Sequence, residues 1–182
     1  MKHASQRVGV FIDAANMYHS AKNLHEARLN FKAVVEAAVA GRQLIRAIAY
    51  VIKTKTGEEK PFFEALEAGG IEIKEKELQE FYGGAKKADW DVGIAVDAIR
   101  IGSVLDVVVI ASGDGDFIPL AEYLKNQGRQ VEVMGFRETT SSKLIEMADD
   151  FTDLSADRKK FLFPMSRSRK NFIMRGGSKV EI

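Results

Sequence analysis

The segment VLDVVVIASGDGDF, residues 104–117, joins a strand-like stretch to a dense acidic loop. Residues 104–111 are mostly apolar and rich in β-branched side chains, a composition typical of a strand that is buried on both faces. The loop that follows carries Asp114 and Asp116, and residues 117–126 then have the pattern of a helix. A strand, a short loop and a helix in this order predict one unit of an α/β fold with a parallel sheet.

The same alternation of strands and helices continues in both directions from this segment. Further strands are expected at residues 8–12, 44–52, 71–75 and 131–136, and further helices at residues 14–24, 31–40, 61–68, 89–101 and 142–148. The clean apolar–polar alternation of residues 71–75 places that strand near an edge of the sheet. The sequence therefore predicts a three-layer, Rossmann-like α/β fold, in which helices flank a five-stranded, mainly parallel sheet.

Charged residues divide the chain into two unequal parts. Residues 1–157 hold 19 basic and 25 acidic side chains, a net charge of −6, whereas residues 158–182 hold 8 basic and one acidic, a net charge of +7. We therefore expect one globular domain at residues 1–157, followed by a basic and flexible tail at residues 158–182. The tail contains Arg167, Arg169 and Lys170, and its charge favours contact with a polyanion such as RNA.

Composition excludes several classes of protein. Hydrophobic residues make up 46% of the chain, which is too many for a disordered protein. There is no cysteine, so a disulfide framework, a cysteine-based zinc site and a cysteine nucleophile are excluded. No apolar run approaches the roughly 18–20 residues of a membrane helix, and the polar start of the chain does not have the pattern of a signal peptide. We expect a cytoplasmic protein without a membrane partner.

Four aspartates are expected to meet at the carboxyl edge of the sheet. Asp13 ends the first strand, and Asp114 and Asp116 follow the fourth. Ligands of doubly wound sheets bind at that edge, so these three carboxylates converge if the first and fourth strands are neighbours. Asp91 lies near the start of the helix at residues 89–101, on the stripe that should face the sheet, and therefore points toward the same edge.

Carboxylates packed this closely repel one another unless they are protonated, hydrogen-bonded or neutralised by a cation. Oxygen ligands without cysteine or paired histidine select Mg²⁺ or Mn²⁺. Such a centre can hold a phosphodiester oxygen and activate a water for in-line attack, so the spacing favours metal-dependent phosphodiester hydrolysis. Simpler roles stay open: Asp13 and Asp116 could cap the helices that follow them, and Asp114 could be a turn residue.

Three further polar residues near these aspartates are candidates, of which Asp97 and Ser112 are the weaker ones. Asn16 lies one helical turn beyond Asp13, where it could hold a water molecule or the scissile phosphate, or be an ordinary polar residue of the first turn. Asp97 lies roughly 240° around its helix from Asp91, so it does not share a face with it and either supports the site or is solvated. Ser112, which directly precedes the acidic loop, is also a supporting candidate.

Three motifs, in the order found here, resemble the NYN domain family and its LabA-like branch most of all. They are FIDAANM at residues 11–17, KADWDVGIAVDA at residues 87–98 and VIASGDGDF at residues 109–117. The resemblance covers about residues 7–150. It implies a PIN-like nuclease fold with a five-stranded parallel sheet, an acidic pocket that binds a divalent metal, and RNA as the usual substrate.

Carried over position by position, the resemblance also implies the residues of an active site. They are four aspartates and one asparagine: Asp13, Asn16, Asp91, Asp114 and Asp116. Asp97 matches a recurrent family position. PIN domains usually add an acidic residue on a middle helix, and Glu64 or Glu67 could stand in for it here.

Two further features suggest partners. Lys86 and Lys87 lie in a glycine-containing loop near Tyr82, where they could grip a phosphate backbone while the ring stacks on a base; a solvated loop explains them equally well. Residues 161–163, FLF, form an apolar cluster just past the body, which a second copy of the chain could cover in a homodimer.

The main hypothesis is a ribonuclease that depends on Mg²⁺ or Mn²⁺, and the alternative is a non-catalytic regulatory module that keeps the fold and binds RNA or protein. A phosphatase or Toprim-type enzyme ranks lower. The haloacid dehalogenase pattern puts an Asp-x-Asp pair on the first strand, where this chain has Asp13-Ala-Ala. A Rossmann dehydrogenase also ranks lower, because Gly113-Asp-Gly115 is not followed by the third glycine of a dinucleotide loop.

Overall fold

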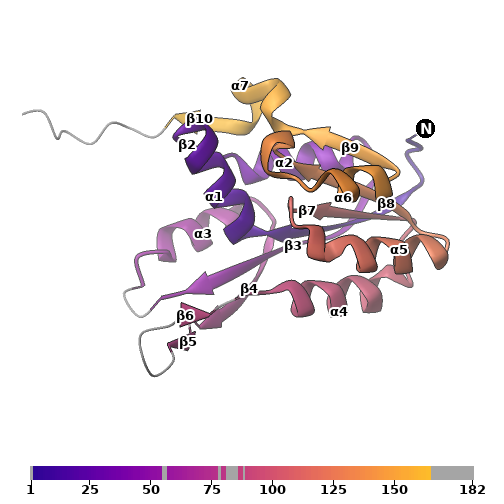
Figure 1. Ribbon diagram of the computed structural model, residues 1–182, viewed down its shortest axis with the longest axis horizontal. Coiled ribbons are helices and arrows are strands. Elements are labelled where there is room, and N and C mark those ends of the chain that lie inside the picture. The colour runs from indigo at the N-terminus through magenta and orange to yellow at the C-terminus, as the bar shows by residue number, and fades with distance from the viewer. Residues whose placement is uncertain (1, 55–56, 78, 81–85, 88, 165–182) are drawn as a thin grey trace, which may run out of the picture.

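Figure 1 shows a computed structural model of the chain, in which helices surround a central sheet. The structure describes residues 2–54, 57–77, 79–80, 86–87 and 89–164. Among these residues, no helix combines the length and the apolar character that crossing a bilayer requires.

The central sheet has six strands, all parallel, in the spatial order β4-β3-β1-β7-β8-β9. In chain order they are β1 (Arg7–Asp13), β3 (Gln43–Lys53), β4 (Glu72–Glu77), β7 (Val107–Ala111), β8 (Gln130–Gly135) and β9 (Asp150–Asp153). The predicted α/β class is confirmed, and β4 is the expected edge strand. The sheet has one strand more than the five expected. The sequence does not reveal this strand, β9, because its four residues, DFTD, are mostly polar and show no apolar run.

Two layers of helices cover the two faces of the sheet (Figure 1). One layer holds α1 (Ala14–His25), α2 (Phe31–Val39) and α3 (Lys60–Ala68), and the other holds α4 (Asp91–Gly102), α5 (Ile118–Asn126) and α6 (Ser142–Met147). In β1, Val10 and Ile12 pack with the first layer and Phe11 with the second. Both faces of the central strands are buried, which explains their continuous apolar sequences.

Short elements complete the fold. They are β2 (Ala27–Leu29), an antiparallel pair formed by β5 (Gln79–Glu80) and β6 (Lys86–Lys87), three 3₁₀ turns, η1 (Gly115–Phe117), η2 (Arg137–Thr139) and η3 (Leu154–Asp157), then α7 (Arg158–Phe161) and β10 (Leu162–Pro164). β10 pairs antiparallel with β2, beyond the end of α1 (Figure 1).

Residues 158–164 pack against the body, whereas the sequence assigns them to a flexible tail. Phe161 and Leu162 are buried in the same core cluster as residues of α1 and α2, and the Phe161 carbonyl accepts a hydrogen bond of 2.7 Å from the backbone N–H of Asn30. The chain itself therefore covers most of the apolar cluster that suggested a homodimer, although Phe163 stays 49% exposed. Residues 165–182, with Arg167, Arg169 and Lys170, lie outside the described residues.

A buried ion pair links the segment before β3 to β8. Arg42 donates two hydrogen bonds of 2.8 Å to the carboxylate of Glu132, and it also donates to the carbonyls of Ala38 and Val39. The Arg42 and Glu132 side chains are only 1% and 5% exposed. Removing one partner of such a pair leaves the other charge buried and uncompensated, which costs much more than losing a surface pair.

We predict that Glu132→Ala lowers the free energy of unfolding by about 3–5 kcal/mol. Glu36→Ala is a matched control, because it removes an exposed partner of Lys32 on α2 and should change the same free energy by less than about 1 kcal/mol. Urea unfolding followed by circular dichroism measures both values. A cost for Glu132→Ala as small as that of the control would contradict the role assigned to the pair.

Candidate metal centre

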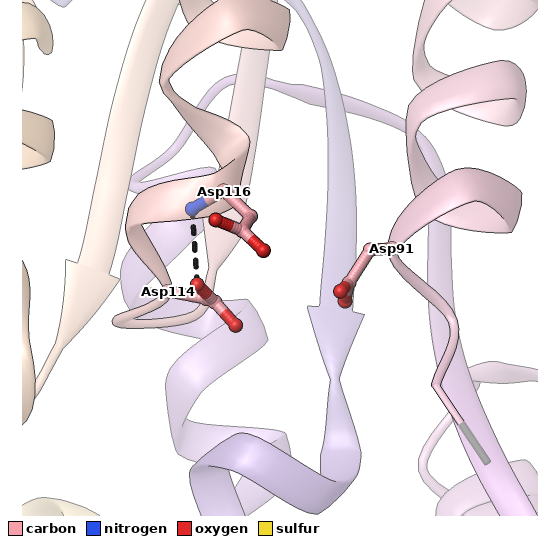
Figure 2. Close-up of side chains that lie close together, drawn as sticks. All are labelled: Asp91, Asp114 and Asp116. Atoms are coloured by element: carbon pink, nitrogen blue, oxygen red, sulfur yellow. Dashed lines mark hydrogen bonds between the residues drawn. The ribbon is translucent and has the colours of Figure 1, made fainter. Parts of the chain in front are cut away.

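Three carboxylates come together at the carboxyl edge of the sheet. Asp91 is the first residue of α4, Asp114 follows β7, and Asp116 lies in η1. One carboxylate oxygen of each lies within 4.8 Å of the other two. Figure 2 shows Asp91 facing Asp114 and Asp116 across the end of β1. We call these three residues the acidic group.

The pairing of β1 with β7 places the acidic group. Ile12 in β1 lies opposite Ala111 in β7, so the loop after β7 begins beside the end of β1, as the sequence predicts. Asp91 reaches the same edge from α4, whose sheet-facing side carries the buried Ile94 and Ala98. The expected convergence of these aspartates is confirmed for the three residues of the acidic group.

Hydrogen bonds fix the loop that carries Asp114 and Asp116. The Gly113 N–H donates to Asn16 Oδ1 at 3.0 Å, and the Asp114 N–H donates to Ser112 Oγ at 3.2 Å. The Asp116 N–H donates to the Asp114 carboxylate at 2.9 Å, so Asp114 caps η1. These hydrogen bonds attach the loop to α1 and to the end of β7.

Gly113 lets this loop pack against the loop after β8. A Cβ at this position would lie 2.6 Å from the Thr139 carbonyl oxygen and 3.0 Å from Thr140 Cα, both backbone atoms that cannot easily move. The Ser141 N–H donates to the Gly113 carbonyl at 2.9 Å across the same contact. The glycine of the SGDGD motif is thus needed for this close packing.

Asp13 borders the acidic group but does not belong to it. Its Oδ1 accepts a hydrogen bond from the Asn16 N–H at 3.1 Å, which caps α1, and its Oδ2 accepts one from Ser112 Oγ at 3.3 Å. The capping role that the sequence left open is therefore present. Asp13 and Asn16 both hold the loop and α1 together, and a direct role for either at a metal stays a prediction.

Burial and neighbouring negative charges raise the pKa values of two carboxyls at this edge. Burial raises the pKa of Asp91, and the charges of Asp114, Asp13, Asp89 and Asp116 raise it further. Burial also raises the pKa of Asp13, against the lowering effect of its hydrogen bonds from the Asn16 N–H and the Ser112 hydroxyl. Ionising either carboxyl is thus harder here than in water.

No lysine or arginine neutralises these carboxylates in the part of the chain that the structure describes. None of the ion pairs there involves Asp13, Asp91, Asp114 or Asp116. A gathered set of carboxylate oxygens without a protein cation fits a hard divalent ion such as Mg²⁺ or Mn²⁺. The acidic group therefore has the donor chemistry of a metal centre.

Asp97 lies in a different environment, on the side of α4 that faces β3 and β4. It is only 7% exposed, and its Oδ2 accepts hydrogen bonds from the Tyr50 hydroxyl at 2.9 Å and from Lys74 Nζ at 2.5 Å. Burial alone would raise the pKa of Asp97, but these two partners lower it overall. Of the two roles that the sequence left open for Asp97, solvation is wrong.

Glu64 and Glu67 do not join the acidic group. They lie on α3, which covers the opposite face of the sheet from α4, and they line a cavity of about 300 Å³ together with Lys53 and Lys60. Glu64 also lies 3.9 Å from Lys60 Nζ. The middle-helix acidic residue of PIN domains therefore has no counterpart in the acidic group.

The other predicted contacts are largely outside the described residues. Tyr82 is not described, and of Lys86 and Lys87 only the backbone is, in the short strand β6. The structure also reveals a residue that the sequence analysis misses. Trp90 directly precedes Asp91 and packs on β3. Its position next to the motif aspartate is the sequence feature that could have identified it.

We predict that Asp91→Asn raises the melting temperature of the metal-free protein at neutral pH. A carboxyl whose pKa is raised by folding favours the folded state only when protonated, so its ionised form costs stability once the pH exceeds the raised pKa. Excess Mn²⁺ should reverse the order, because it stabilises the wild-type chain more than the variant. Glu122→Gln, on the exposed side of α5, is the control. Differential scanning fluorimetry would contradict this account if Asp91→Asn melted below the control without metal.

Comparisons with known proteins identify relatives of this chain. Residues 7–155 match the sequence model of the NYN domain. The chain is 25% identical over 166 residues to the low amplitude and bright protein LabA of Synechococcus elongatus, a distant homologue, and the match covers 85% of this chain and 87% of LabA. The structure also resembles the crystal structure of VPA0982, a Vibrio parahaemolyticus protein of unknown function, with a TM-score of 0.80, 29% identity and coverage of 90% of this chain and 99% of that one. Because the family match spans most of the chain and includes the acidic edge of the parallel sheet, this protein belongs to the NYN domain family.

Proposed function

We propose that this chain is a metal-dependent ribonuclease that hydrolyses phosphodiester bonds of RNA at the acidic group. The observation that carries the proposal is the approach of Asp91, Asp114 and Asp116 within 4.8 Å, without a lysine or arginine to pair with them among the described residues. NYN domains are related to PIN-like nucleases, which supports the same chemistry.

The residues have distinct tasks in this proposal. A bound Mg²⁺ or Mn²⁺ supplies charge to hold a phosphate oxygen and to lower the pKa of a water molecule. Asp91, Asp114 and Asp116 hold that ion. Asp13 adds negative charge beside them, while Ser112 and Asn16 fix the loop and α1 by the hydrogen bonds described above.

RNA must approach an edge that is itself negatively charged. The tail beyond Pro164 holds five basic residues and one acidic residue, and it supplies the attraction that the acidic group lacks. Lys86, Lys87 and Tyr82 are further candidate contacts, placed in the segment just before the helix that carries Asp91. The proposed partner is therefore RNA, held mainly through its phosphates.

One observation favours a second candidate, a module that binds RNA or protein without cleaving it. Both oxygens of Asp13 are engaged in hydrogen bonds, and Glu64 and Glu67 lie on the opposite face, so three aspartates gather where the resemblance implies four or more acidic residues. Binding of RNA that persists in chelator, without cleavage in Mn²⁺, would favour this candidate.

We predict that Asp114→Asn reduces Mn²⁺-dependent cleavage of single-stranded RNA by more than roughly 100-fold. Loss of a residue that only supports a metal ligand reduces activity by up to about 100-fold, and loss of a ligand itself should cost more. The fold should survive, because an asparagine oxygen can still accept the hydrogen bond from the Asp116 N–H. Glu122→Gln should cleave as the wild type does. A gel assay with labelled RNA, in Mn²⁺ and in chelator, measures the rates. Undiminished metal-dependent cleavage by Asp114→Asn would refute the assignment of the site.

We predict that deleting residues 165–182 weakens RNA binding and flattens its dependence on salt. Each lost phosphate contact should reduce the slope of log affinity against log salt by about 0.7 for single-stranded RNA. The affinity for Mn²⁺ should stay that of the full chain, because the deletion removes none of the three aspartates of the acidic group. Fluorescence anisotropy at several salt concentrations measures the slope. An unchanged slope would show that the tail does not contact the phosphates.

A further inference from the structure

The carboxylates of the acidic group repel one another at the start of α4. Asp91 belongs to α4, whereas Asp114 and Asp116 belong to the loop after β7, so their repulsion tends to move the helix away from the loop. The first turn of α4 has no side-chain cap, since Trp90 occupies the N-cap position and makes no capping hydrogen bond. Other interactions must hold Asp91 in place before a cation arrives.

Trp90 provides the first of these interactions. Its indole Nε1–H donates a hydrogen bond of 2.9 Å to the Val51 carbonyl in β3, and its ring packs against the Tyr50 ring with centroids 5.3 Å apart. Gly93 leaves room for the indole, because a Cβ there would lie 2.5 Å from the ring carbon Cε3 of Trp90. The residue next to Asp91 is therefore attached to β3.

Asp97 provides the second interaction, about two turns further along α4. Its Oδ2 accepts hydrogen bonds from Tyr50 in β3 and from Lys74 in β4, as described above. Tyr50 is fully buried, so its hydroxyl has no access to water and depends on Asp97. Tyr50 thus contacts α4 at two points, through its ring to Trp90 and through its hydroxyl to Asp97.

Lys76 provides a third interaction at the entrance to the helix. Its Nζ donates a hydrogen bond of 2.8 Å to the Asp89 carbonyl and lies 5.6 Å from the centre of the Trp90 ring. All three interactions join α4, or the two residues that precede it, to β3 and β4, which lie on the other side of β1 from β7. They therefore do not depend on the loop that carries Asp114 and Asp116.

We propose that Trp90, Tyr50 and Asp97 are positioning residues, which hold α4 in place against the repulsion within the acidic group and so set Asp91 for a metal before the metal binds. The part of this inference that concerns metal affinity rests on the proposed function. A site that is already assembled binds more tightly, because the ion does not have to draw the carboxylates together.

A thermal double-mutant cycle tests the inference without metal or RNA. Tyr50→Phe removes only the hydroxyl that donates a hydrogen bond to Asp97, and it keeps the ring that packs against Trp90. In the wild-type background, Asp91→Asn should raise the melting temperature because it relieves repulsion. In the Tyr50→Phe background the helix has already moved, so the same substitution should raise it by clearly less.

Glu75→Gln is the matched control for this cycle. It breaks an ion pair of 3.3 Å with Lys53 on the same two strands, but on the face that α3 covers. The rise caused by Asp91→Asn should be unchanged in this background. An equal rise in the wild-type, Glu75→Gln and Tyr50→Phe backgrounds would overturn the inference, whatever the protein does with metal.

Tryptophan fluorescence adds a direct reading of metal affinity. Trp90 is the only tryptophan of the chain and adjoins Asp91, so paramagnetic Mn²⁺ bound at the acidic group should quench its emission. Tyr50→Phe should raise the Mn²⁺ concentration at half-quenching on the order of 10-fold, with the full quench restored at saturation. Glu75→Gln should titrate as the wild type does.

The outcomes of the titration separate the two proposals. Equal half-quenching concentrations for Tyr50→Phe and Glu75→Gln would overturn the inference and leave the proposed function standing. A wild-type chain that binds no Mn²⁺ at millimolar concentration would overturn the metal-dependent function. The thermal cycle would then still decide whether Tyr50 and its contacts restrain α4.

Discussion

Three like charges within 4.8 Å of one another repel, and the surrounding structure holds them together from two sides. On one side, Ser112, Asn16 and the backbone of Gly113 fix the loop after β7 to α1. On the other side, Trp90 and Asp97 attach α4 to β3 and β4. The parallel pairing of β1 with β7 brings these two parts to one edge, so the local chemistry of the site depends on the topology of the sheet.

The sequence predicts the fold where apolar runs are long and the topology rule is strong. Residues 104–111 identify a strand buried on both faces. The carboxyl-edge rule places Asp114 and Asp116 at the site, and the apolar stripe of the helix at residues 89–101 places Asp91 there. The prediction fails where packing with distant residues decides. β9 is short and polar, and residues 162–164 pair with β2 although the basic residues just before them are typical of a tail.

Side-chain direction is the second feature that the sequence does not predict. Asp97 and Asp91 lie on one helix and in one motif, yet Asp97 turns toward Tyr50 and Lys74, and no spacing rule reveals those partners. Asp13 similarly stands at the predicted edge, but its two oxygens are engaged with Asn16 and Ser112. Which carboxylates gather is therefore a property of the tertiary structure, whereas the approximate location of the site is a property of the sequence.

The central claim is that Asp91, Asp114 and Asp116 form one divalent metal site. Titration calorimetry with Mn²⁺ at neutral pH, on the wild-type chain and on Asp114→Asn, measures this most directly. The account predicts one site per wild-type chain, and a loss of that binding in Asp114→Asn while circular dichroism shows an unchanged fold. Equal Mn²⁺ binding by the two proteins would contradict it.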